Sequence, residues 1–248
     1  MGKQVSTLKM TGSFAGAVGY IDQQGRVQMR SKPEKISDAN TKKQQAVRTR
    51  FLAITSLAKA FSKTAIGLTM VAKSKKISPR NMFTKLNYGA TEATVGADTV
   101  TATTDFTLLE VSRGDNPEVS FGSPQTDDPL TVKVSFAPNS DMPGASEGDL
   151  VYLLVYNPGD NRTIISDPVK RGSGTSQTAS VKVPNGWNGE TVHVWGFSQG
   201  FATEQARTEY LSYWNRKRDA GAAEALTEMN ASDTDFSNSH YIGNGTIS

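Results

Sequence analysis

The stretch LTVKVSFAPNSDMPGASEGDLVYLLVYNPGDNRTIIS, residues 130–166, contains three short runs rich in Val, Leu, Ile, Tyr and Thr. Most of these residue types favour β-strands. The segments PNSDMPG and NPGDN separate the runs with Pro, Gly, Asn and Asp, which are typical of turns. No helical pattern lies between the runs, so consecutive strands are expected to be antiparallel neighbours. The stretch therefore predicts part of an antiparallel β-sandwich.

The same pattern continues on both sides of this stretch. Five further runs of strand-forming residues occur at residues 98–104, 106–112, 117–122, 178–184 and 190–198. A helical pattern follows at residues 202–230, and the closing SNSHYIGNGTIS again favours a strand. We therefore expect a mainly β fold with helical parts, in which residues 91–248 form the sandwich and about 202–232 form a helical insertion.

A β-hairpin is expected near the N-terminus, in the stretch TGSFAGAVGYIDQQGRVQMRSKP at residues 11–33. The runs FAGAVGYI and RVQMR are strand-like, and DQQG between them supplies turn residues. Its glycines do not match a nucleotide site. A dinucleotide fingerprint needs an apolar strand before it and a helix after it, and a P-loop ends in Gly-Lys-Ser/Thr. The stretch therefore predicts a hairpin rather than a phosphate-binding loop.

An amphipathic helix is expected after this hairpin. Its apolar residues recur at steps of four, three, four and three, which places them on one helical face: Val47, Phe51, Ile54, Ala58 and Phe61. A second, short helix is expected at residues 78–89, where Ser78 can cap the N-terminus and Pro79 suits the first helical position. We therefore expect a hairpin-helix module over residues 1–90.

Charge is divided unevenly between these two parts. The chain carries a formal charge of +3, but residues 1–86 hold 17 basic and 3 acidic residues, whereas the remainder holds 10 basic and 21 acidic ones. A segment with a charge of +14 favours a partner that neutralises it, either nucleic acid or an acidic protein surface. The candidate contacts to such a partner are Arg26, Arg30, Lys42, Lys43, Arg48 and Arg50. The candidate assembly contacts are Val47, Phe51 and Ile54.

Few catalytic patterns are present. The chain has no cysteine and only two histidines, so we expect no metal and no cofactor. It has no apolar run long enough to span a membrane and no N-terminal secretion signal, and we expect no membrane insertion. Gly196-Phe197-Ser198-Gln199-Gly200 matches the nucleophile elbow G-x-S-x-G, which leaves a serine hydrolase that uses Ser198 as a minor alternative. The preceding strands lack the helical crossovers of hydrolase folds, so we expect no enzyme.

Six segments together resemble an uncharacterised family of Bacteroidota proteins, copies of which also occur in their phages and prophages. They are GSFAGAVGY, VQMRSKP, Q-x-x-x-R-x-R-F at residues 44–51, SPRNMFTKLN, GWNGETVHVWGF and SNSHYIG. The resemblance implies an N-terminal hairpin-helix module followed by an immunoglobulin-like sandwich. It implies no activity, cofactor or catalytic residue. The helical segment at about 202–232 departs from the family pattern.

The function expected from these observations is a non-catalytic structural or interaction protein, a capsid- or tail-associated component of a phage virion. Its expected partners are copies of itself or other virion proteins, and its location is the virion, assembled in the host cytoplasm, or otherwise the cytoplasm. The alternative is a DNA-binding protein that contacts phosphates through its basic N-terminal module without reading sequence.

Overall fold

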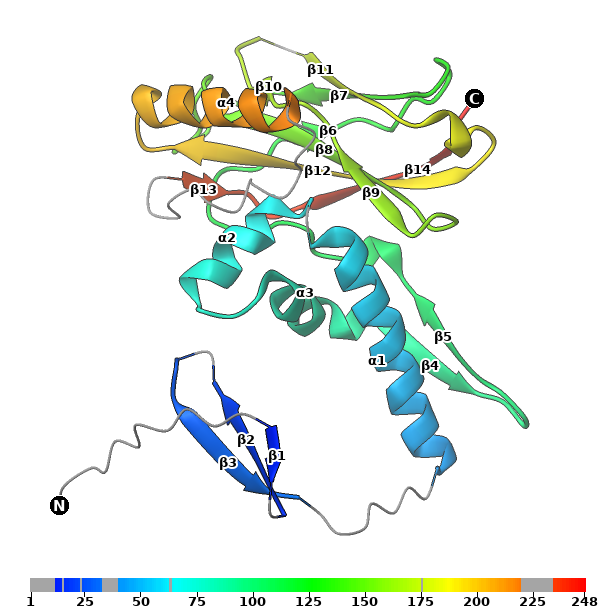
Figure 1. Cartoon of the computed structure of the whole chain (residues 1–248). Coiled ribbons are helices and arrows are strands. Elements are labelled where there is room, and N and C mark those ends of the chain that lie inside the picture. Colours follow the sequence, from blue (N-terminus) through cyan, green and yellow to red (C-terminus); the bar gives the residue numbers. More distant parts are fainter. Residues whose placement is uncertain are drawn as a thin grey trace, which may run out of the picture. The chain divides into compact units, whose positions relative to one another are not determined.

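The structure is a computed structural model, and it describes residues 12–14, 16–22, 24–32, 40–62, 64–174, 176–219 and 234–248. The chain forms two compact units, Met1–Thr41 and Lys42–Ser248 (Figure 1). This division differs from the expected module boundary at residue 90. The reason is that the helices between residues 42 and 87 share a hydrophobic core with the sheets that follow them.

The N-terminal unit contains a three-stranded antiparallel sheet in the order β1–β2–β3. Its strands are β1 (Gly12–Phe14), β2 (Ala17–Ile21) and β3 (Val27–Ser31). Asp22 shapes the turn between β2 and β3, because its Oδ1 accepts hydrogen bonds from the backbone of Gln24 (3.0 Å) and Arg26 (2.9 Å). The backbone N–H of Arg26 lowers the pKa of the Asp22 carboxyl to about 2. The expected hairpin is confirmed, and β1 adds a strand to it.

A large antiparallel sheet lies at the centre of the second unit. Its two central strands are β8 (Leu150–Asn157) and β12 (Thr191–Phe201). The edge of β8 that faces away from β12 pairs with β9 (Arg162–Ile165) and β10 (Val169–Lys170). The edge of β12 that faces away from β8 pairs with β13 (Thr234–Phe236) and β14 (His240–Thr246). The last residues of the chain therefore complete the same sheet as residues 150–170.

A smaller antiparallel sheet covers one face of the large one. It has the order β11–β7–β6 and consists of β6 (Ser120–Phe121), β7 (Thr131–Ala137) and β11 (Gln177–Lys182). Val132, Val134 and Phe136 of β7 share a core with alternate residues of β8, of which Val151 and Leu153 are examples. This packing forms the expected sandwich, and the immunoglobulin-like assignment stays a prediction.

Helices cover the opposite face of the large sheet, so β8 is buried on both sides. They are α1 (Lys42–Phe61), α2 (Ile66–Ser74), α3 (Pro79–Asn87) and α4 (Glu204–Asp219). Phe61 of α1 is stacked on Phe83 of α3 at 5.1 Å between ring centroids, and it contacts Trp195 of β12 at 5.5 Å. Near the start of β8, the ring of Tyr152 contacts that of Trp214 of α4, with ring centroids 5.5 Å apart. The result is three layers: small sheet, large sheet and helices.

A two-stranded hairpin, β4 (Thr91–Val95) and β5 (Val100–Thr104), lies along the first half of α1. Figure 1 shows both elements projecting together, away from the large sheet. Three short 3-10 helices complete the unit: η1 (Tyr88–Ala90), η2 (Phe106–Leu108) and η3 (Asn185–Trp187).

The class of mainly β with antiparallel sheets and a few helices is confirmed, but single elements differ from expectation. The strand expected at 106–112 is wrong. Its first residues form η2, because the Asp105 side chain accepts a hydrogen bond from the backbone N–H of Thr107 (2.9 Å) and caps this turn. Helix α2 and strands β4, β10 and β13 were not expected. The helical insertion is confirmed as α4, while its residues 220–232 lie outside the described residues.

Candidate functional site

The outward side of α1 carries three large apolar side chains that the fold leaves uncovered. Val47 is 60%, Phe51 54% and Leu52 70% exposed. Val47 and Phe51 lie four positions apart and share one side of the helix, whereas Leu52 is turned about 100° from Phe51, so the three form a broad apolar band around the helix. We call these three residues the outer α1 face. An exposed apolar group of this size on a basic helix is typical of an interaction surface.

The expected assembly contacts are only partly on this face. Val47 and Phe51 belong to it, but Ile54 is fully buried in the core between helices and sheet. The prediction for Ile54 as an assembly contact is therefore corrected. Sequence reasoning missed Leu52, because Leu52 does not follow the four-three spacing that the buried half of α1 obeys.

The six expected basic contacts lie on two separate units. Arg26 and Arg30 belong to the N-terminal unit, and the other four lie on α1. Arg26 pairs with Asp22 at 2.7 Å. Lys42 donates to the Ala97 carbonyl at 2.9 Å. The other three basic residues, Lys43, Arg48 and Arg50, differ in their exposure.

Arg50 is held against the chain itself. Its guanidinium lies 4.0 Å from the centre of the Tyr88 ring and donates to the Tyr88 carbonyl at 2.6 Å. Lys43 and Arg48 are exposed on α1. The basic groups presented next to the outer α1 face are therefore Lys43 and Arg48, with Lys42 at the start of the helix.

A buried ion pair organises the loops at one end of the sandwich. Arg171 is completely buried, and its Nη1 lies 3.2 Å from Oδ2 of Asp149, which is also buried. The same guanidinium donates to the carbonyls of Pro117 (2.9 Å), Glu118 (2.9 Å), Pro138 and Asn139 (3.3 Å). One side chain therefore ties together the loop before β6 and the loop after β7.

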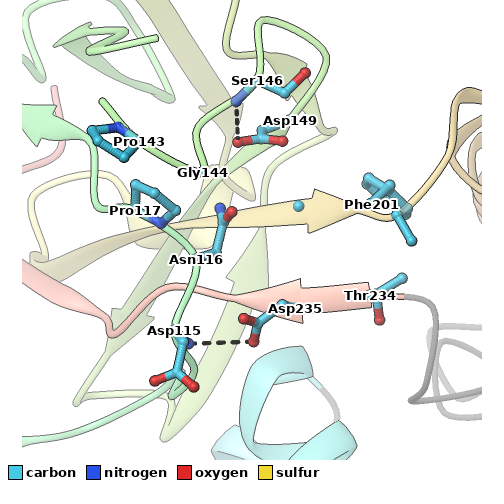
Figure 2. A pocket seen from close by; sticks show the side chains of 12 residues that line it. Asp115, Asn116, Pro117, Pro143, Gly144, Ser146, Asp149, Phe201, Thr234 and Asp235 are labelled. Atoms are coloured by element: carbon cyan, nitrogen blue, oxygen red, sulfur yellow. Dashed lines mark hydrogen bonds between the residues drawn. The ribbon is translucent and has the colours of Figure 1, made fainter. Parts of the chain in front are cut away.

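A pocket of about 410 Å³ lies beside this ion pair. Figure 2 shows Ser146 and Asp149 on one side of it and Asp115 and Asp235 on the other. Asp149 accepts a hydrogen bond from Ser146 N (3.1 Å), and Asp235 accepts one from Asp115 N (3.3 Å). Two of the three pocket carboxylates are thus already used to hold the loops. The pocket alone does not indicate a ligand.

The surface around this pocket is strongly acidic. Five exposed acidic residues lie on the loops that Arg171 connects and on the adjoining β13: Asp115, Glu118, Asp141, Glu147 and Asp235. We call this group the acidic loop end. Apolar side chains lie among these carboxylates, namely Pro117, Pro143 and Phe201 in the pocket and the 45% exposed Met142.

Ser198 of the G-x-S-x-G motif lies in the middle of β12 and is fully buried. Its Oγ accepts a hydrogen bond from Asn116 Nδ2 (2.8 Å) and donates one to the Pro117 carbonyl (3.1 Å). His240, the histidine that follows Ser198 in the chain, is stacked on Phe121 with ring centroids 6.5 Å apart. A nucleophile elbow requires an exposed serine at a sharp turn between a strand and a helix. This geometry gives the serine-hydrolase hypothesis no support.

The two glycines of that motif have a packing role. A Cβ on Gly196 would lie closer than 3.0 Å to three ring atoms of Phe121, and one on Gly200 would approach Asn116 Oδ1 equally closely. The segment between residues 116 and 121 therefore lies directly on the small residues of β12. This close packing explains why glycines flank Ser198.

Two negative observations concern the described part of the chain. No group of three or more His, Asp or Glu side chains there could hold a metal ion. No single helix among these residues is long and apolar enough to cross a membrane, and only the pair α1 and α2, bent by 104°, passes that test jointly on length and composition.

The fold and these surfaces define a mainly β protein with antiparallel sheets and a helical layer. The chain belongs to a family of unknown function (DUF6266), whose model matches residues 10–212. This match covers both units and ends within α4. No curated protein and no solved structure matches the chain.

Proposed function

We propose that this chain is a non-catalytic structural protein that assembles through the outer α1 face. The observation that carries the proposal is the exposure of Val47, Phe51 and Leu52 on a helix that projects from the body of its unit. Solvation of three such side chains is unfavourable, and their burial in an assembly stabilises it by about 1.5–3 kcal/mol for each side chain that becomes fully buried. Hydrophobic faces of this kind commonly mark protein contacts.

The assembly we propose is a phage virion, formed in the cytoplasm of a Bacteroidota host. Support comes from the resemblance to the Bacteroidota family whose members also occur in phages, and from the antiparallel sandwich, an architecture that hosts many contact modules. Mass spectrometry of purified particles from a phage that carries this gene tests the location. The chain should be present in many copies per particle, and its absence from the particles would refute a virion role.

Sedimentation velocity of the intact chain tests assembly through the outer α1 face. The double variant Phe51→Ser with Leu52→Ser should sediment as a smaller species than the wild type. Leu108→Ser is the matched control, because Leu108 is also exposed (62%) but lies outside this face. Equal sedimentation of the double variant and the wild type would show that another surface holds the assembly.

DNA binding by the basic N-terminal residues is the second candidate, and the charge of +14 over residues 1–86 favours it. Neutralisation of about six phosphates would give a slope of about −5 for log affinity against log salt. At least four of the six candidate residues already interact within the chain, so we expect a shallower slope if DNA binds. Titration of duplex DNA with the full chain at low salt tests this, because residues 42–90 share their core with the sheets. Absence of binding would leave the charge to protein contacts.

A further inference from the structure

Charge and shape together indicate what covers the outer α1 face. The basic residues Lys42, Lys43 and Arg48 lie on the same helix as the three exposed apolar side chains. A surface that covers this face must therefore combine apolar and acidic side chains. Acidic side chains gain favourable electrostatic energy there, whereas basic ones are repelled.

The chain itself presents a surface with these properties. The acidic loop end carries five exposed carboxylates, and two of them, Asp115 and Asp235, line the pocket together with Pro117, Pro143 and Phe201. The buried pair of Arg171 and Asp149 fixes the loops that hold them. The surface is thus preformed, which lowers the entropic cost of binding to it.

These two surfaces cannot meet within one chain. In Figure 1, the first half of α1 projects from the helical layer together with β4 and β5. The pocket lies at the opposite side of the same unit, where β12 ends at Phe201 and α4 begins. A contact between them must therefore join two different copies.

We infer that the outer α1 face of one copy docks onto the acidic loop end of a second copy. This inference rests on the proposed function and adds the identity of the partner surface. The contact is heterologous, because two different surfaces meet. After the first contact forms, the pair keeps one unused α1 face and one unused acidic loop end, so the chain builds a ring or an open filament rather than a two-fold dimer.

A mixing experiment with two variants tests this inference. The first variant, Phe51→Glu with Leu52→Glu, disables the α1 face and retains the acidic loop end. The second variant, Asp141→Lys with Glu147→Lys, disables the loop end and retains the α1 face. All four positions are exposed, so neither variant disturbs the core. The charge-matched control is Asp127→Lys with Glu190→Lys, which alters two exposed acidic residues away from the pocket.

Each variant alone should be monomeric by sedimentation velocity and native mass spectrometry, while the control should assemble as the wild type does. An equimolar mixture of the two variants should form a heterodimer and nothing larger, because only one complementary pair of surfaces remains. An increase in salt should weaken this heterodimer, since some of its contacts are charged.

Three outcomes would overturn the inference. Assembly of the loop-end variant by itself would show that α1 meets another surface, for example α1 of a second copy. Monomers in the mixture would show that the two surfaces do not bind each other. In both cases the wild type still assembles and the proposed function stands. A wild-type chain that stays monomeric at all concentrations would instead remove the proposed assembly as well.

Discussion

Arg171 and Asp149 form an ion pair that is closed to solvent at both partners, with Nη1 and Oδ2 3.2 Å apart. Four backbone carbonyls accept the remaining hydrogen bonds of the guanidinium. A buried charge that loses its partner is costly, because neither water nor another group replaces the lost interaction. The shape of the acidic loop end therefore depends on one pair of side chains.

The first prediction concerns this pair. Arg171→Met should lower the free energy of unfolding by about 3–5 kcal/mol, because it leaves Asp149 charged, buried and without its cation. The double variant with Asp149→Asn should lose less than the sum of the two single losses, since the partners interact directly. Urea unfolding of the four proteins measures this, and strictly additive losses would contradict the pairing.

The second prediction concerns the close packing on β12. Gly196→Ala should destabilise the fold by about 1–3 kcal/mol, because the added methyl group overlaps the Phe121 ring. Gly186→Ala is the control, since a Cβ there meets no atom within 4 Å. Thermal unfolding of both variants compares them, and an equal Tm for the two would show that Phe121 does not pack on Gly196 as described.

The third prediction concerns Ser198. A fluorophosphonate probe should not label the folded chain at Ser198, because this serine is buried and has no histidine as a hydrogen-bond partner. Intact mass spectrometry and peptide mapping measure the labelling. Stoichiometric modification of Ser198 that disappears in Ser198→Ala would establish the hydrolase alternative instead.

The fourth prediction concerns pH. His193 is stacked on Phe106 with centroids 4.1 Å apart, its Nδ1 is 2.9 Å from the Tyr241 hydroxyl, and burial lowers its pKa. The unfolded chain therefore binds a proton at this residue more readily than the folded one. The contribution of neutral His193 to the free energy of unfolding is fully present above the ordinary histidine pKa of about 6.5. This contribution decreases as the pH falls below that value.

Urea unfolding at pH 7.5 and pH 5 measures this effect in the wild type and in His193→Gln. The variant should lose less stability than the wild type between these two values. A loss of the same size in both proteins would assign the pH dependence to other groups.

The fifth prediction concerns the N-terminal sheet. Both core clusters of the second unit consist of residues from Ile54 onwards, so deletion of residues 1–33 should leave the Tm of that unit unchanged. The N-terminal sheet exposes Tyr20, Ile21 and Met29, and none of its described apolar side chains is fully buried, so it lacks the hydrophobic face that independent stability requires. We therefore expect the hairpin to contact a neighbouring copy as an auxiliary contact that does not hold copies together without the outer α1 face, and its deletion should weaken the oligomer. If the truncated chain and the intact chain show the same oligomeric state by sedimentation velocity, this role is excluded.

Strand-forming runs bounded by turn residues were sufficient to predict most of the sandwich. The run at 150–157 succeeded because each of its residues is buried, on one face by the small sheet and on the other by helices. The run at 106–112 failed for a related reason. Leu109 and Val111 are buried in an irregular segment, and apolar residues in such a segment resemble a strand in the sequence.

The candidate surface was harder to predict than the fold. Hydrophobic spacing identified α1, but spacing does not show where along the helix its apolar face leaves the core. The change occurs between Phe51, which is exposed, and Ile54, which is buried, because the helical core begins at Ile54. The acidic loop end could not be predicted at all, since Arg171 gathers it from distant loops.

The pairing of β12 with β14 has a consequence for the order of events during synthesis. Translation proceeds from the N-terminus, and β14 at His240–Thr246 emerges from the ribosome after β12 and α4. Until then, the outer edge of β12 has unpaired backbone groups that another nascent chain could occupy. The time between the appearance of β12 and that of β14, set by the length of the α4 insertion, is therefore the interval in which this protein is most exposed to mispairing with its neighbours on a polysome.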